Sequence, residues 1–564
     1  MLTRRELLQV AVAAAPLLVG FGNVTRALAR QRLGQEDILR FEPLGQVTIL
    51  HITDIHAQLV PLYFREPSVN IGVGEAAGRP PHLTGRDFLA HFGLEAGSPE
   101  AYMLTSEDFD ALARAYGKVG GLDRIATLVE AVRAERGEDR VLLLDGGDTW
   151  QGSWTALRTR GEDMVRAMNL LRPDAMTAHW EFTYGAERVE ELIGMLEFPF
   201  LAQNVRDTDW EEPVFDGVAY FERGGVKVAV IGQAFPYTPV ANPRWMIPQW
   251  SFGIREEELQ ALVREAREQE GAELVVLLSH NGFDVDHKLA SRVEGIDVIL
   301  TGHTHDAMPR PMKVGNTLLV ATGSHGKFVS RLDLRVEGGR VVDYAYKLMP
   351  VLADAIVPHP EMAKTVTELR APYAAELSEV VGETEITLYR RGNFNGTMDD
   401  VILAALLERR EAEIALSPGF RWGASLPSGA PIDREFVYTH TAMTYPQVYR
   451  IEMTGAQLKT VMEDVADNLF NPDPYYQQGG DMVRVGGMGY RIDPTAPMGR
   501  RIIDMTLLAT GEPVDPDRKY VVAGWASVNP DVEGPPVWEL VLDYIRDRRV
   551  LGGEKVSRVE LVRG

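Results

Sequence analysis

The chain contains no cysteine among its 564 residues. This absence excludes disulfide bonds, thiolate metal ligands and a cysteine nucleophile, and it leaves the compartment unreadable from cysteine pairing. Any metal site must therefore be built from His, Asp, Glu or Asn side chains. Positive charge is also scarce, since 58 Lys and Arg stand against 81 Asp and Glu, which gives a formal charge of -23. Such a surface repels phosphate backbones and argues against a nucleic-acid partner.

Long hydrophobic runs are missing as well, because no apolar stretch beyond the N-terminus reaches the length of a membrane span. At the N-terminus Arg4 and Arg5 precede an apolar run over residues 10–21, and a small-residue pattern ends at Ala29. This combination predicts that residues 1–29 are a twin-arginine signal peptide, with an ordinary amphipathic first helix as the alternative. We therefore expect export to a bacterial periplasm and no membrane association after removal of the signal.

The length of the chain exceeds the span of one hydrophobic core, about 250 to 300 residues, so we expect two domains. The hydrophobic share of 45% and the charged share of 25% are typical of a soluble globular protein. From residue 46 onward apolar strand patterns alternate with helical ones, which predicts βαβ layers and an α/β fold. The predicted strands include residues 47–50, 141–144, 226–231, 274–278, 298–300 and 317–320, and the predicted helices include 122–136, 161–171, 399–410 and 454–468.

The domain limits are predicted where this alternation breaks. Residues 46–356 form the first domain, in which the Pro- and Gly-bearing stretch at about 61–116 is long for a connection and is interpreted as an insertion beside the active site. Residues 357–381 are polar and helix-favouring, so they are predicted to be a linker helix. Residues 382–564 form a smaller second domain.

Five short segments place His and Asp side chains at or near the ends of predicted strands. In an extended strand end residues i and i+2 lie on one side, so Asp54 can share a cation with His56, and His303 with His305. Each motif alone is weak, because a lone strand-end His or Asp is more often a capping or surface residue, but five in order predict a metal cage. The segments are Asp54-Ile55-His56, Gly147-Asp148, Thr177-Ala178-His179-Trp180-Glu181-Phe182, His280-Asn281 and Gly302-His303-Thr304-His305.

In this order the segments resemble the calcineurin-like metallophosphoesterases of the 5'-nucleotidase superfamily. The resemblance implies an N-terminal four-layer α/β/β/α sandwich and a smaller α/β substrate-binding domain at the C-terminus. It also implies a two-metal centre whose bound hydroxide is the nucleophile. We expect two Mn2+ ions, with Zn2+ or Fe as alternatives, because mixed imidazole and carboxylate ligation suits these metals. The implied ligands are Asp54, His56 and His305 for one metal, His179, His280 and His303 for the other, and Asp148 as the bridge.

One box departs from the nucleotidase pattern. Where that group has Gly-Asn-His-Glu-Phe-Asp, this chain has Ala-His-Trp-Glu-Phe-Thr over residues 178–183. His179 can still ligate a metal, but Trp180 replaces the transition-state histidine and Thr183 replaces its partner aspartate. An indole cannot protonate a leaving alkoxide, and losing such a group costs roughly 10²- to 10⁴-fold in rate. We assign catalytic roles to Asp148, His179 and Trp180; a purely structural Trp180 in an ordinary phosphatase is the alternative.

A thiolate or persulfide leaving group needs no proton, and the box at residues 179–185 is similar to that of the Sox-system thiosulfohydrolases, or sulfate thiol esterases. The stretches at residues 391–396 and 475–481 carry the same resemblance. It implies hydrolysis, by water, of the terminal sulfonate of a cysteine S-thiosulfonate on the carrier protein SoxYZ, with release of sulfate. We expect a monomer. The alternatives are a periplasmic 5'-nucleotidase or cyclic-nucleotide phosphodiesterase, and a degenerate module that binds the carrier without chemistry.

Basic and glycine-rich segments of the second domain are the candidate substrate contacts. Guanidinium forks suit sulfonate oxygens, and a helix start follows one arginine pair, although a solvated charge cluster is an equal alternative there. The glycines between residues 477 and 489 permit close approach by an extended carrier arm, with a plain flexible loop as the alternative. The candidate substrate-binding residues are Arg390, Arg391, Asn393, Arg421, Tyr445, Gln478 and Gly479.

Overall fold

The computed structural model describes residues 33–562. The predicted signal peptide, residues 1–29, lies outside the described residues. Within residues 33–562 no helix combines the length and the apolar character that crossing a bilayer requires.

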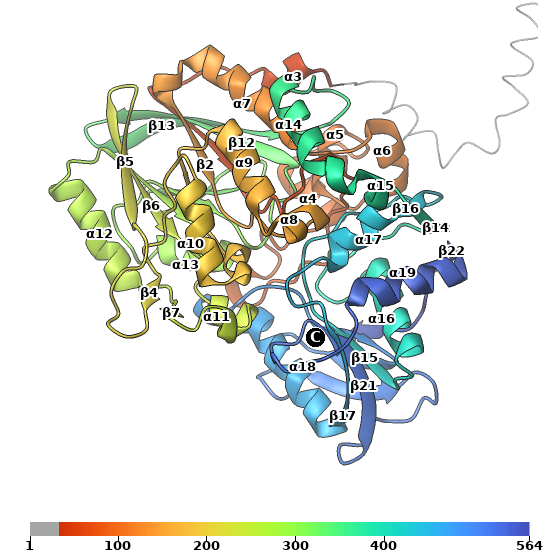
Figure 1. Cartoon of the computed structure of the whole chain (residues 1–564). Coiled ribbons are helices and arrows are strands. Elements are labelled where there is room, and N and C mark those ends of the chain that lie inside the picture. Colours follow the sequence, from red (N-terminus) through yellow and green to blue (C-terminus); the bar gives the residue numbers. More distant parts are fainter. Residues whose placement is uncertain (1–32, 563–564) are drawn as a thin grey trace, which may run out of the picture.

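Two sheets lie face to face in the N-terminal part of the chain (Figure 1). The first has the strand order β13-β12-β1-β2-β3, in which β1, β2 and β3 are parallel and β12 and β13 are antiparallel additions. The second has the order β10-β11-β9-β8-β6-β5, with four parallel strands between two antiparallel edges. Their bounds are β1 Val47–Ile52, β2 Val141–Asp145, β3 Ala175–Met176, β12 Phe328–Glu337, β13 Arg340–Pro350, β5 Val218–Arg223, β6 Val226–Gln233, β8 Leu274–Ser279, β9 Val298–Thr301, β10 Met312–Val314 and β11 Thr317–Ala321.

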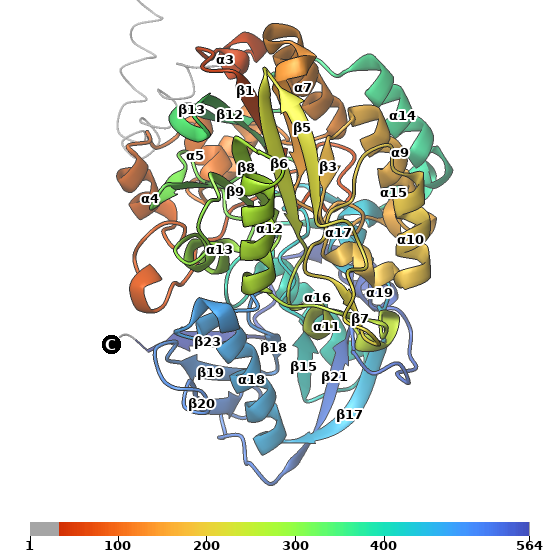
Figure 2. The ribbon, with the colours of Figure 1, turned by 90° about the vertical axis from the view of Figure 1, so that its left-hand side faces the viewer.

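Side-chain alternation along the strands separates the interior into layers. On β1, Val47 and Ile49 enter the core between the two sheets, whereas Leu50 and Ile52 face a core under helices. Helices α7 (Leu122–Arg136), α9 (Glu162–Leu171), α10 (Ala186–Met195) and α14 (Pro360–Arg370) cover the first sheet. Helices α12 (Glu256–Glu268) and α13 (Phe283–Ala290) cover the second, as Figure 2 shows from the side. The predicted four-layer α/β/β/α sandwich is confirmed.

The predicted insertion contains helices rather than strands. It carries α4 (Gly85–Phe92), α5 (Pro99–Leu104) and α6 (Phe109–Tyr116). A buried ion pair between Lys327 and Glu66 fixes it to the sandwich, and the Lys327 ammonium also donates to the Met103 carbonyl at 2.8 Å. The insertion therefore packs as part of the domain's core.

The C-terminal part forms three smaller sheets and lies at one end of the sandwich (Figure 1). The largest has the order β17-β21-β15-β18, and the others are β16-β14-β22 and β20-β19-β23. Strand bounds are β14 Val380–Thr384, β15 Ile414–Ser417, β16 Pro431–Asp433, β17 Val448–Thr454, β18 Arg484–Gly486, β19 Met488–Ile492, β20 Ile502–Leu507, β21 Lys519–Trp525, β22 Val550–Leu551 and β23 Arg558–Leu561. The helices are α16 Thr397–Arg409, α17 Arg434–Thr441, α18 Gly455–Phe470 and α19 Val537–Arg548. This is the smaller α/β unit that was expected.

Candidate metal centre

The candidate ligands follow the carboxyl ends of strands from both sheets, at the edge that faces the C-terminal part. Asp54 and His56 follow β1, Asp148 follows β2, and His280 follows β8 directly. His303 and His305 follow β9, and His179 comes after β3. Because the carboxyl ends of parallel strands meet at one edge, residues far apart in sequence converge there.

Two groups of side chains result, and Asp148 belongs to both. Within each group one potential ligand atom from every residue lies within 4.8 Å of the others. All seven residues have exposed fractions of 8% or less. The groups are Asp148, His179, His280 and His303, and Asp54, His56, Asp148 and His305.

The backbone here is not the extended chain on which the spacing argument relied. Asp54 and His56 have φ angles of 52° and 50°, and His303 and His305 have φ angles of 73° and 60°. These are left-handed conformations, uncommon for residues other than glycine. His303 and His305 fall into different groups, so the prediction from alternation that they share a cation is wrong, whereas Asp54 and His56, with the same type of backbone conformation, do share a group.

The interatomic distances fit cations at the centre of each group. His56 Nε2 lies 3.0 Å from His305 Nε2, and His305 Nε2 lies 3.2 Å from Asp54 Oδ1. His280 Nε2 lies 3.2 Å from Asp148 Oδ2. Ligand atoms about 2.1 Å from one cation, at angles of about 90° to 109°, are about 3.0 to 3.4 Å apart. Residue types and distances together therefore suit a pair of divalent metal ions.

Backbone carbonyls orient three of the imidazole rings. His280 Nδ1 donates to Gly146 O at 2.6 Å, and His56 Nδ1 donates to Gln151 O at 3.2 Å. His303 Nε2 donates to Gln478 O at 3.0 Å. A carbonyl only accepts, so each of these ring nitrogens carries a proton and the opposite nitrogen is the one available to a metal.

The electrostatics of the cluster also favour cations. Burial alone would raise the pKa of Asp148, but His179, His280 and His56 outweigh it and hold that pKa well below its usual range. Burial lowers the pKa of His56 and His179, and it places the pKa values of His303 and His305 well below their usual range. Burial also opposes the charged form of His280, but Asp148 and Asp54 outweigh it and raise the pKa of that ring to about 10, so these carboxylates already favour positive charge in the cluster. Buried carboxylates among imidazoles are a ligand set for cations.

Glu181 was not assigned a role from the sequence, although it lies within the quoted box. Its buried carboxylate accepts from the backbone N–H groups of Asp148, Thr149, Trp150 and His179 at 3.3, 2.6, 3.2 and 2.8 Å. It therefore ties the loop that carries one ligand to the loop that carries another. Its position two residues after His179 was the only signal the sequence offered.

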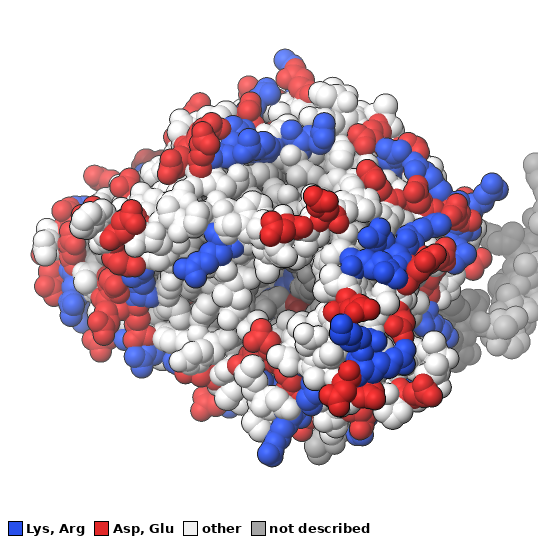
Figure 3. Space-filling model, turned by 60° about the horizontal axis from the view of Figure 1, so that its bottom comes forward, with Lys and Arg blue, Asp and Glu red and all other residues white. Residues whose placement is uncertain are grey.

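A pocket of about 180 Å³ opens above the cluster, lined by residues of both parts of the chain. The Trp180 ring centroid lies 5.3 Å from that of His179 and 4.9 Å from that of Trp422, which stacks on Phe420 at 4.1 Å. These three aromatic side chains line one wall. Among the described residues that line this pocket, Arg421 is the only charged side chain that does not belong to a ligand group. The surface between the two parts is hollowed near the centre of the face in Figure 3.

The candidate substrate residues divide into three sets. Arg421, Gln478 and Gly479 line the pocket. Asn393 lines an adjoining cavity, where its Oδ1 accepts from Ile71 N at 2.6 Å. The structure does not bring Arg390, Arg391 or Tyr445 to the pocket wall, because other protein groups hold their side chains.

Arg390 is buried inside the C-terminal part and its nitrogens are already occupied. Its Nε donates to Asp399 at 2.8 Å, and its terminal nitrogens donate to the carbonyls of His440 and Pro418 at 3.1 and 2.8 Å. The side chain therefore stabilises its own domain. The sequence could not reveal this, because Asp399 becomes its partner only through the turn into α16.

Arg391 and Tyr445 also point to protein groups. Arg391 Nη2 donates to Thr304 O at 3.0 Å, between the two histidines of that segment. The buried Tyr445 hydroxyl donates to Ala241 O at 3.3 Å. Both residues join the two parts of the chain near the pocket.

The comparisons with known proteins agree with this geometry. Residues 376–532 match the family model described as 5'-nucleotidase, C-terminal domain. The 5'-nucleotidase of Bos taurus is 25% identical over 471 residues, covering 74% of this chain and 79% of that protein. A 5'-nucleotidase precursor from Thermus thermophilus has the same fold, with a TM-score of 0.72 at 22% identity, covering 92% of this chain and 100% of that one.

A second solved structure is more similar. The Thermus thermophilus sulfate thiohydrolase SoxB, in complex with glycerol, superposes with a TM-score of 0.90 at 38% identity. The match covers 93% of this chain and 98% of the SoxB chain. Nearly the whole described chain thus shares both fold and substantial sequence with that protein. The chain belongs to the SoxB family within the 5'-nucleotidase superfamily of metallophosphoesterase-like proteins.

Proposed function

We propose that the chain is a periplasmic thiosulfohydrolase that removes the terminal sulfonate from a cysteine S-thiosulfonate on the carrier protein SoxYZ and releases sulfate. One observation carries the proposal: the pocket above the ligand groups has an aromatic wall and, among the described residues, no acid side chain beyond the candidate ligands. Membership of the SoxB family supports the same reading.

The seven clustered Asp and His side chains are proposed as the ligands of two Mn2+ ions, with Zn2+ or Fe as alternatives. When bound, such a pair lowers the pKa of a water and neutralises charge on the substrate oxygens. Asp148 is proposed as the bridge because it alone belongs to both groups. The hydrogen bonds of His56, His280 and His303 to backbone carbonyls fix which ring nitrogen of each is available to a metal, and on His280 a metal would displace the proton that Asp148 and Asp54 favour there.

The chain's own residues then position the substrate. Arg421 lines the pocket and places a positive charge beside the cluster, which favours a sulfonate there, while its terminal nitrogens donate to the carbonyls of Thr304 and Gly480. Trp180, Phe420 and Trp422 line the pocket. They are proposed to contact the sulfur atoms of the substrate, since polarizable sulfur packs well against aromatic rings, and to exclude water from the leaving side. Gln478 and Gly479 also line the pocket, and they are proposed to lie beside the bound carrier segment.

The bond changes explain why the missing acid does not matter. The S–S bond between the sulfonate sulfur and its neighbour breaks, and a water oxygen joins the sulfonate sulfur, which leaves as sulfate while the two protons of the water pass to solvent. The electron pair stays on the carrier as a persulfide. A thiol has a pKa of only about 8.5, so a sulfur anion leaves without taking a proton. An alkoxide would need one, and Trp180 has none to give; this argues against the nucleotidase alternative.

The test is sulfate release from thiosulfonate-loaded SoxYZ by purified protein, with bound metals counted in the same preparation and AMP assayed in parallel. The proposal expects about two metals per chain, stoichiometric sulfate and little phosphate from AMP. Rapid AMP turnover without sulfate release would assign the protein to the nucleotidases instead. Loss of sulfate release on chelation, and its return with Mn2+, is the expected control.

A further inference from the structure

Three residues of the C-terminal part hold the segment Gly302–His305 of the N-terminal part. Arg391 Nη2 and Arg421 Nη1 both donate to the carbonyl of Thr304, at 3.0 and 3.3 Å. The carbonyl of Gln478 accepts from the ring of His303 at 3.0 Å. Since His303 and His305 belong to different ligand groups, this one segment helps to set both groups.

A second contact reaches the other side of the cluster through His325. Its backbone N–H donates to Asp54 O at 2.8 Å, and its ring centroid lies 5.5 Å from that of His56 and 5.8 Å from that of His305. Its Nε2 accepts from the N–H of Gly423, in the loop that also carries Arg421, at 3.3 Å. The fully buried His325 therefore links a ligand-bearing segment to the C-terminal part.

These contacts matter because the segment they hold is strained. The left-handed backbone at His303 and His305 costs free energy, and such conformations persist only where the surroundings fix them. A charge-assisted hydrogen bond contributes more than a neutral one, and here two guanidinium groups converge on a single carbonyl oxygen. Much of what fixes the segment therefore comes from the other part of the chain.

We infer that docking of the C-terminal domain sets the geometry of the metal centre. Arg391 of that domain and His325 of the N-terminal part are positioning residues, and through them metal affinity depends on docking. The inference rests on the two-metal centre proposed above. It gives Arg391 a role other than the substrate contact expected from the sequence, since its guanidinium is buried and reaches Thr304 rather than the pocket. By linkage, metal binding must in turn stabilise the docking of the two parts.

The first experiment compares Mn2+ affinity across variants, using full-length protein stripped by a chelator and titrated with metal alone. Arg391→Met should weaken binding by about 10- to 100-fold, the usual cost of losing a group that orients a ligand. Arg391→Lys should recover part of it, because an ammonium can still donate to Thr304. The matched control is Arg114→Met, which removes another contact between the two parts, to Ser428, without touching a candidate ligand.

The outcomes separate this inference from the proposed function. A wild-type chain that binds no metal would overturn the two-metal centre itself. Wild-type affinity in Arg391→Met, with only KM for the carrier raised, would leave that centre intact and make Arg391 a substrate contact. Equal weakening in Arg114→Met would also refute the specific role of Arg391.

A second measurement needs no variant and so does not depend on a mutant folding. Hydrogen exchange at the amide of Gly423, which donates to His325, is followed in wild-type protein with and without Mn2+. The inference expects exchange to be slower by roughly 10-fold or more when metal is bound, because docking then gains the coupling free energy. An unchanged rate at Gly423, while amides of the cluster loops slow down, would refute the coupling.

Discussion

Replacing Gly479 by alanine should damage the metal centre from the C-terminal side. Gly479 has a φ of 72°, and an added Cβ would lie 2.4 Å from His303 Nε2, against 3.4 Å for ordinary contact. The ring must therefore retreat by about 1 Å, which exceeds the roughly 0.2 Å tolerance of metal–ligand distances. It also loses its hydrogen bond to Gln478 O. The left-handed backbone adds about 1 to 2 kcal/mol for an L residue.

The matched control is Gly480→Ala. Gly480 has a φ of 79°, so it carries the same backbone cost, but the nearest atom to its Cβ would be Gly419 O at 3.7 Å. Metal counting and Mn2+ titration should show metal binding weaker by roughly 10-fold or more in Gly479→Ala and wild-type affinity in Gly480→Ala. Both should unfold at lower urea concentration. Two metals bound at wild-type strength in Gly479→Ala would refute the reasoning that His303 is a ligand held from this side.

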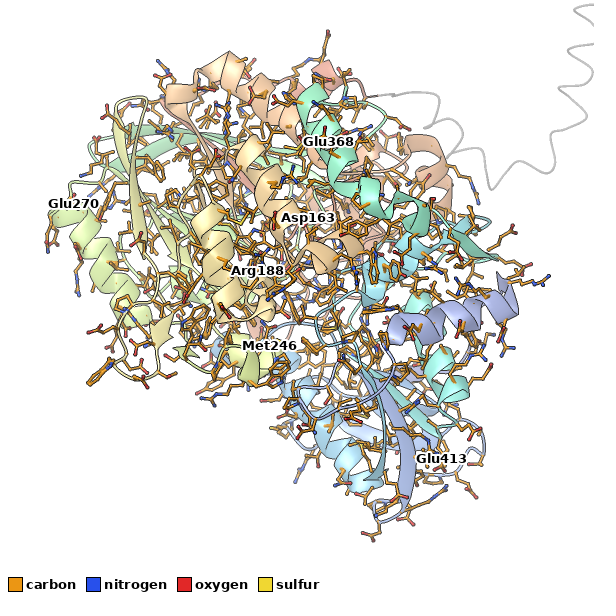
Figure 4. All side chains as sticks on the ribbon, in the orientation of Figure 1. Asp163, Arg188, Met246, Glu270, Glu368 and Glu413 are labelled. Atoms are coloured by element: carbon orange, nitrogen blue, oxygen red, sulfur yellow. The ribbon has the colours of Figure 1, made fainter. Side chains whose placement is uncertain are left out.

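The Asp148→Asn variant should abolish sulfate release while thermal unfolding shows a folded protein, because the charge shared by both ligand groups is lost; unchanged turnover would count against a bridging role. The double change Trp180→His and Thr183→Asp should restore proton donation and raise turnover of a phosphate ester by roughly 10²-fold or more. The new carboxylate at position 183 would face the Thr444 hydroxyl that now contacts Thr183. No gain in phosphate release would contradict the assigned role of residues 178–183. Asp163, inside the N-terminal part on α9 (Figure 4), has its pKa raised by burial to about 6, so its charged form destabilises the fold above that pH. The free energy of unfolding of Asp163→Asn, measured in urea relative to that of wild type, should therefore increase by up to about 3 kcal/mol as the pH rises from about 4 to about 7. A difference between the two proteins that does not change with pH would exclude this explanation.

The layered fold could be predicted because its signals are local. The helix predicted at residues 122–136 has the same bounds as the observed α7, and the observed strand that begins at Val47 extends two residues beyond its predicted end. Apolar periodicity and strand alternation depend on near neighbours, so they survive folding unchanged. The observed C-terminal helices α16 and α18 also lie within two residues of the predicted ranges at each end.

The site was less predictable, because its geometry depends on contacts between distant residues. His303 and His305 have a left-handed backbone and belong to different ligand groups, whereas the alternation of a simple strand end would place them together. The sequence around Arg390 suggests an anion-binding site, but in the fold the Arg390 guanidinium is paired with Asp399. His325 follows strand β11 as the ligands follow theirs, which is the signal that could have identified it.

The leaving group is proposed to depart from this pocket without receiving a proton from the protein. This proposal is tested most directly by measuring kcat/KM of the metal-loaded protein for matched sulfur- and oxygen-linked leaving groups of graded pKa. We expect kcat/KM to fall steeply as the leaving-group pKa rises, with almost no turnover of substrates that release an alkoxide. A rate independent of leaving-group pKa, with oxygen-linked esters cleaved as fast as sulfur-linked ones, would contradict it.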